Sequence, residues 1–98
     1  MKAARQAWDM AVDVCDENPD YTALRLVSVA VQLERLALET DAKEGKALQR
    51  DIVRRCESIL KLSGLPPRME EYVSAALAAA SGQADAVTLY ALSRRIAF

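Results

Sequence analysis

The chain has 98 residues, the length of one domain (1–98), and 52% of them are apolar. It contains no histidine, so the commonest general base and metal ligand are missing, and we expect no enzymatic activity, cofactor or metal site. The net charge of −1 excludes a strongly basic protein, but residues 1–41 carry a net −4 and residues 42–68 a net +4. These segments can pair within one protomer, pair between protomers or face different partners.

Apolar residues at spacings of three and four predict a first helix from about Ala3 to Cys15, with Trp8 in the core. A second helix is expected from about Pro19 to Glu39. Asn18 would be its N-cap, and Asp20 would lie in its first turn, where the helix dipole favours an anion. This helix carries two apolar stripes, which predicts a central helix or a helix buried in an oligomer interface. The first stripe is Leu26, Val29, Ala30, Leu33, Leu36 and Ala37, and the second is Leu24, Val27, Val31 and Leu38.

The polar stretch Thr40–Lys46, with Gly45 near its end, predicts a bend between antiparallel helices. A third helix is expected from about Ala47 to Leu62. Gly64 is then suited to a left-handed cap, and Pro66 prevents the helix from continuing. The apolar face of this helix is Leu48, Ile52, Val53, Cys56, Ile59 and Leu60.

A fourth helix is expected to begin at Pro67 and to end before Ser81-Gly82. Asp85 can cap a fifth helix, with Arg94 and Arg95 in its last turn. The fold class predicted is therefore all-α, a small bundle of five helices around a central antiparallel helical hairpin. The apolar residues expected in these two helices are Tyr72, Val73, Ala76, Leu77 and Ala80, then Leu89, Leu92 and Ile96.

Two charged helix faces are the candidate binding sites. Lys46, Arg50, Arg54 and Lys61 share one side of the third helix, with Arg55 beside them. The first helix carries an acidic face made of Asp9, Asp13, Asp16 and Glu17. Each face has a simple interpretation as hydrated surface, and the alternatives are a partner-binding patch for either face or a site for a hard cation at the carboxylates.

The two cysteines, Cys15 and Cys56, are far apart in sequence and have no metal-ligand or redox-motif spacing. We expect both to be small core residues with reduced thiols. No apolar run reaches the ~18 residues of a membrane span, and no signal peptide is evident. The expected location is the cytoplasm.

The segment from about Trp8 to Arg68 resembles the small terminase subunits of tailed phages, particularly the P27-like group. The shared features are an Asp-led apolar helix (Asp20-Tyr21-Thr22-Ala23-Leu24-Arg25-Leu26), a helical hairpin and a closing element that Gly64, Leu65 and Pro67 match, while Arg68 comes two residues early. The chain adds two predicted helices after that element. The resemblance implies a non-enzymatic, ring-forming DNA-packaging component that works with a large ATPase–nuclease subunit.

The sequence thus favours a non-enzymatic helical protein that binds a protein partner or oligomerises, with DNA packaging as the role implied by the resemblance. Nucleic acid and a homo-oligomer remain open as partners, and a membrane is not expected. The alternative is a small regulatory or inhibitor protein, encoded by a phage or a bacterium. Such a protein would present the acidic face of its first helix to a basic surface.

Overall fold

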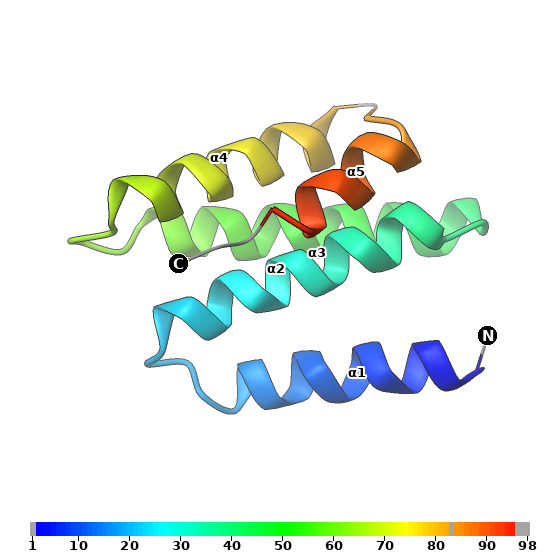
Figure 1. The fold of residues 1–98 in the computed structure, drawn as a ribbon, viewed down its shortest axis with the longest axis horizontal. Helices are drawn as coiled ribbons and strands as arrows, with labels where there is room; N and C mark the ends of the chain where they lie inside the picture. Colours follow the sequence, from blue (N-terminus) through cyan, green and yellow to red (C-terminus); the bar gives the residue numbers. More distant parts are fainter. Residues whose placement is uncertain (1, 83, 96–98) are drawn as a thin grey trace.

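The computed structural model describes residues 2–82 and 84–95, which form five α-helices (Figure 1). The described residues contain no strand, so the predicted all-α fold is confirmed. The helices are α1 (Lys2–Asp16), α2 (Thr22–Leu38), α3 (Ala42–Leu60), α4 (Pro67–Ser81) and α5 (Ala86–Ser93).

Helix α2 is the centre of the fold, because it packs against each of the other four helices. Figure 1 shows α1 below α2, with α3, α4 and α5 above it. α2 and α3 form the predicted antiparallel hairpin. The two apolar stripes of α2 are explained by this position, because a helix covered on several sides needs more than one apolar face.

The main core lies between α2, α3, α4 and α5, and α1 contributes little to it. α1 buries Val12 and Cys15 and packs against α2 alone among the helices. Trp8, expected in the core, is only partly buried at the edge of the α1–α2 contact, and its Nε1 donates to Glu34 Oε2 at 2.8 Å. The indole needs this polar partner, which holds it at the surface of the contact. The core side chains without exposed surface are Leu26, Val29, Leu33, Ile52, Cys56, Val73 and Ala76.

The start of α2 differs from the prediction. Asn18, Pro19 and Asp20 lie in the connection, and the helix begins at Thr22 with Tyr21 at the N-cap position. The side chain of Asn18 donates to the Val14 carbonyl at 2.7 Å, so it satisfies the end of α1. Since that amide is used by the preceding helix, Asn18 does not cap the next one.

The start of α3 also differs, because the predicted bend is shorter. Asp41 is the N-cap, and its carboxylate accepts from the Lys43 N–H at 2.8 Å. Gly45 lies inside the first turns, where its N–H donates to the Asp41 carbonyl at 2.9 Å. The cost of a helical glycine, about 1 kcal/mol, is small beside an aspartate cap and the buried face that follows, so the helix extends through Lys46.

The later helix ends are mostly as predicted. α3 ends at Leu60 with Lys61 as its C-cap, so Gly64 is not the cap, and its left-handed φ of 74° belongs to the turn that follows. Pro67 opens α4 as predicted. Asp85 caps α5, because its carboxylate accepts from the Thr88 N–H at 2.8 Å.

The structure corrects the predicted end of α5. The helix ends at Ser93, so Arg94 is the C-cap and Arg95 follows it, instead of both lying in the last turn. The Arg94 N–H is shared between the carbonyls of Tyr90 and Ala91, which closes the helix there. Ile96, predicted to be buried, lies outside the described residues.

Candidate functional site

The four basic residues predicted on α3 share one exposed surface, which we name the basic face: Lys46, Arg50, Arg54 and Lys61. They are spaced four, four and seven residues apart, on the side of α3 that is turned away from the core residues Ile52, Cys56 and Ile59, and Lys61 is the C-cap that directly follows the helix. Arg54 has 70% of its side-chain surface exposed. The structure thus brings the predicted cluster together on one side of one rigid element.

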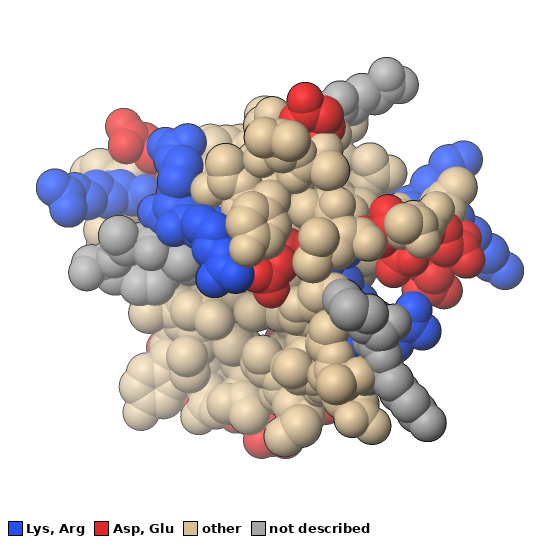
Figure 2. Space-filling view, turned by 45° about the vertical axis from the view of Figure 1, so that its right-hand side comes forward, with Lys and Arg blue, Asp and Glu red and all other residues tan. Residues whose placement is uncertain are grey.

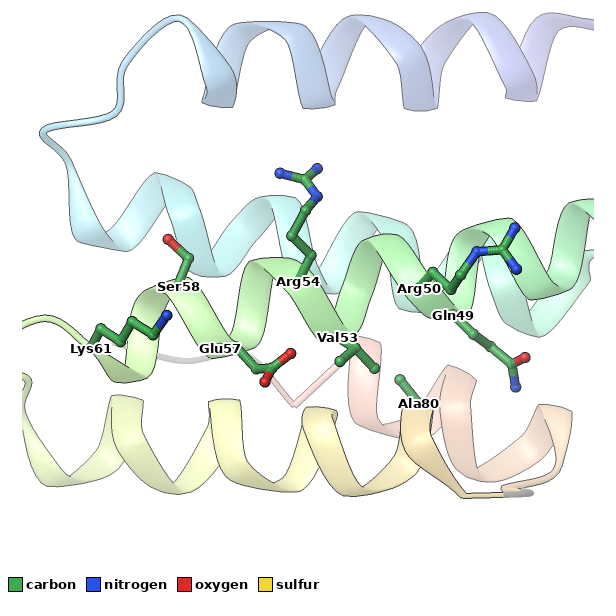
Figure 3. Close-up of a pocket in the computed structure, with 8 residues that line it drawn as sticks. All are labelled: Gln49, Arg50, Val53, Arg54, Glu57, Ser58, Lys61 and Ala80. Carbon is green, nitrogen blue, oxygen red and sulfur yellow. The ribbon is translucent and has the colours of Figure 1, made fainter.

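The basic face borders an open hollow of about 560 Å³ between α3 and α4. Arg50, Arg54 and Lys61 line it together with Val53 of α3 and Ala80 of α4, and Figure 3 shows that Arg54 points away from α4, toward α1. Glu57 is the one acidic side chain in this lining. The hollow therefore combines three cations, one anion and a small apolar floor.

A second, smaller hollow of about 150 Å³ adjoins the first, because Arg54 and Ser58 line both. It lies where α3 meets the end of α1 and the start of α2, and Arg25 and Ser28 also line it. Arg25 donates through Nε to the Pro19 carbonyl at 2.7 Å, which fixes its side chain beside this hollow. The cationic surface of α3 is thereby extended by one arginine from α2.

Arg55 does not belong to the basic face, although the sequence placed it beside those residues. Its side chain is only 14% exposed and joins three helices. It donates through Nη1 and Nη2 to the Asp16 carboxylate at 2.7 and 3.1 Å, and through Nε to Asp51 at 2.7 Å. A further contact of 3.3 Å reaches the Ser28 hydroxyl. The fork of the guanidinium suits this bidentate pairing, which ties the end of α1 to α3.

The carboxylates beside Arg55 are held in their charged form. The hydrogen bonds from Arg55 are the largest cause that lowers the pKa of Asp16. Burial raises the pKa of Asp51, but hydrogen bonds from Gln32, Arg55 and Arg54 together outweigh burial, and the net shift is downward. The pKa of Arg55 is raised, chiefly by its hydrogen bonds to Asp16. We name Asp16, Asp51 and Arg55 the charge cluster.

The predicted acidic face of α1 is divided by the fold. Asp9 pairs with Arg35 of α2 at 2.9 Å, and Asp16 belongs to the charge cluster. Asp13 and Glu17 are exposed, and they form no ion pair among the described side chains. Two of the four carboxylates therefore stabilise the fold, which leaves a weaker acidic surface than the sequence suggests.

Both cysteines are buried and unpaired with each other, as expected of small core residues. Burial raises the pKa of both thiols, and that of Cys56 rises to about 12. Among the described residues, no three cysteine or carboxylate side chains lie together as a metal would need. In the same residues, no helix is both long and apolar enough to cross a membrane.

Sequence reasoning found the basic face and missed the charge cluster. The spacing of Asp51 and Arg55, four residues apart, is a sequence signal for a pair on one helix. The partner from α1, Asp16, has no such signal, because it comes from 39 positions away in the chain.

No protein-family model matches the chain, and no curated protein or solved structure matches it either.

Proposed function

We propose that this protein is a non-enzymatic binding protein whose basic face holds an acidic macromolecule. The observation that carries the proposal is the arrangement of Arg50, Arg54 and Lys61 around one open hollow on a rigid helix. Cations on a single helix face attract phosphates or carboxylates without needing a deep pocket. The side chains around this hollow include no histidine or cysteine that could serve as a base or thiol nucleophile, which suits binding rather than catalysis.

Duplex DNA is the acidic partner that we propose first. The resemblance to the small terminase subunits of phages implies a DNA-packaging component, and the basic face supplies the phosphate contacts that such a role requires. With three or four cations on one helix, we expect DNA binding that is weak, sensitive to salt and independent of base sequence. A location in the cytoplasm belongs to the same proposal and fits two buried thiols.

The competing role is a regulatory protein that presents the acidic face of α1 to a basic partner. The fold favours this role less, because Asp9 and Asp16 are already paired with arginines of α2 and α3. A partner would have to displace those arginines or use only Asp13 and Glu17.

The deciding experiment measures binding of a labelled 30-base-pair DNA duplex by fluorescence anisotropy over a series of salt concentrations. The test variant is Arg50→Glu with Lys61→Glu, which leaves Arg54 and its Asp51 partner in place. The matched control is Arg5→Glu with Arg95→Glu, two exposed arginines outside the basic face. It changes the net charge by the same amount.

We expect wild type to bind DNA at low salt and the test variant to bind at least ten-fold more weakly, with a shallower salt dependence. The control variant should stay within about three-fold of wild type, because long-range charge effects are screened over ~8–10 Å. Equal losses in both variants would show that overall charge, and not the basic face, governs binding. If wild type fails to bind DNA at 50 mM salt, the packaging role is wrong. Capture of a basic protein from host lysate, lost on Asp13→Lys with Glu17→Lys, would instead support the regulatory role.

A further inference from the structure

Helix α5 has apolar residues on both of its sides. Leu89 and Leu92 point into the core and are 6% and 5% exposed. On the opposite side, Val87 is 78% exposed and Tyr90 is 39% exposed. A helix that is apolar on all sides is normally buried on all sides. The outer side of α5 is apolar but exposed among the described residues, as is typical of a surface that binds a partner.

The outer side of α5 continues onto the end of α2. Leu38, which is 50% exposed, lies with Val87, Tyr90 and Ala91 around a shallow hollow of about 330 Å³. We name these four residues the α5 face. In Figure 2, the middle of the view is mostly uncharged surface. The α5 face shares no residue with the basic face, so it offers a second, independent surface.

Charges of opposite sign lie at the two ends of the α5 face. At one end, Arg94 stacks on the Tyr90 ring with 5.1 Å between its Cζ atom and the ring centroid, and it donates to the Tyr90 hydroxyl at 2.9 Å. Its guanidinium also pairs with Glu34 of α2 at 2.8 Å, and 64% of its side-chain surface stays exposed. At the other end, Glu39 and Asp41 follow Leu38 directly in the chain.

We infer that the α5 face binds a second copy of this chain in a two-fold dimer. If two α5 helices cross antiparallel about an axis near Tyr90 and Ala91, the apolar centres meet. Arg94 of each copy then faces the Glu39 and Asp41 end of the other. A two-fold contact needs a self-complementary surface, and an apolar centre between a basic and an acidic end meets this need.

The α5 face is small for a protein interface. A stable interface buries about 800 Å² on each partner, roughly an eighth of the 6306 Å² surface of this chain. The α5 face consists of one helix of eight residues and the end of another. It is therefore smaller than a permanent interface, and the expected dissociation constant is on the order of 10–100 μM.

Sedimentation velocity between 5 μM and 1 mM tests this dimer. Wild type should pass from monomer to dimer over that range. Val87→Lys should weaken the dimer at least ten-fold, because it places a cation in the apolar centre and close to Arg94 of the other copy. Val14→Lys is the matched control, since Val14 is also an exposed helical valine (55%) and lies on α1, away from this face. It should dimerise as wild type does.

A second variant protects the test against a folding defect. Lysine is a good helix former, so Ala91→Lys should leave α5 intact, which circular dichroism would check, and should also weaken the dimer. Symmetry is tested by Ala91→Cys, which should form a covalent dimer on mild oxidation. Only a two-fold contact brings a residue against its own counterpart. Met10→Cys, on the exposed surface of α1, should form little covalent dimer under the same oxidation.

A wild type that is monomeric at 1 mM would overturn the inference. So would a dimer that Val87→Lys and Ala91→Lys leave unchanged, or assembly into rings with no covalent dimer from Ala91→Cys. None of these outcomes depends on whether the basic face binds DNA, because the two surfaces share no side chain.

Discussion

Two adjacent arginines on α3 have opposite surroundings. Arg54 is exposed and pairs with Asp51 of its own helix, one turn earlier. Arg55 is turned inward and joins α1, α2 and α3 through Asp16, Ser28 and Asp51. A change of one position along a helix rotates a side chain by about 100°, which is enough to separate surface from interior. The same residue type therefore contributes to a binding face in one case and to the fold in the other.

Arg55→Ala should lower the free energy of unfolding by about 2–4 kcal/mol, because it leaves two carboxylates without their shared partner. Arg54→Ala should cost no more than about 0.5 kcal/mol, since exposed ion pairs contribute little. Urea denaturation followed by circular dichroism measures both. If Arg55→Ala lowers the free energy of unfolding by no more than Arg54→Ala is expected to, the charge cluster adds little to the stability of the fold.

At the level of the helix, α1 is attached differently from the others. Among the described residues, α1 packs against α2 and no other helix, and Val12 and Cys15 are the side chains that it buries. Its remaining ties are polar: Trp8 with Glu34, Asp9 with Arg35, and Asp16 with Arg55. Because polar contacts at the edge of a protein add less than buried apolar area, α1 is the long helix that opens most easily.

Hydrogen exchange should show this difference directly. We expect the amides of α1 to exchange at least ten-fold faster than those in the middle of α2 and α3, because α1 can open without disrupting the main core. Mass spectrometry of exchanged peptides gives the measurement. Equal protection in α1 and α3 would mean that the five helices open only together.

Gly45 offers a gain in helix stability. It lies inside α3, and an added Cβ would meet only Leu36 Cδ1, at an ordinary contact distance of 3.9 Å. Gly45→Ala should therefore raise the free energy of unfolding by about 0.5–1 kcal/mol, through helix propensity and a less flexible unfolded chain. Gly64→Ala is the contrasting variant. It should destabilise the protein, because its φ of 74° strains any residue with a Cβ. Thermal melts would check both signs.

For the whole molecule, the charge cluster makes the free energy of unfolding depend on pH in the acidic range. The pKa values of Asp16 and Asp51 are lowered in the folded state from 3.8. The unfolded chain therefore takes up protons first as the pH falls, and the stability that these carboxylates add above pH 4 is lost below it. Unfolding free energies measured from pH 6 to pH 2 should fall steeply below about pH 4. Asp16→Asn should flatten that fall, and an unchanged fall in this variant would show that the charge cluster does not cause it.

Alkaline pH acts through Tyr72. Its hydroxyl donates to the Leu92 carbonyl at 3.1 Å, and burial is the main cause that raises its pKa to about 12. Since the unfolded tyrosine ionises near pH 10, the folded state retains its proton longer, and stability falls as the pH rises from 10 toward 12. Tyr72→Phe should remove part of this loss. An unchanged pH profile in that variant would assign the loss to other groups, Cys56 first among them.

The sequence alone determined the number and type of the helices and most of their buried faces. Leu33 and Ile52, for example, follow from the 3.6-residue period, because each helix must bury one apolar stripe whatever its neighbours are. The cap at Asp85 and the left-handed backbone at Gly64 also follow from the sequence, since they depend on local hydrogen bonds and local backbone angles.

Only the tertiary structure decided which charges pair and which stay free. The separation of Arg54 from Arg55, and of Asp16 from Asp13, depends on the docking of α1 beside α2 and α3. It also decided that Asn18 ends one helix and does not begin the next. In each case the possible pairings or caps have similar local energies, so contacts between residues far apart in the chain decide which one forms.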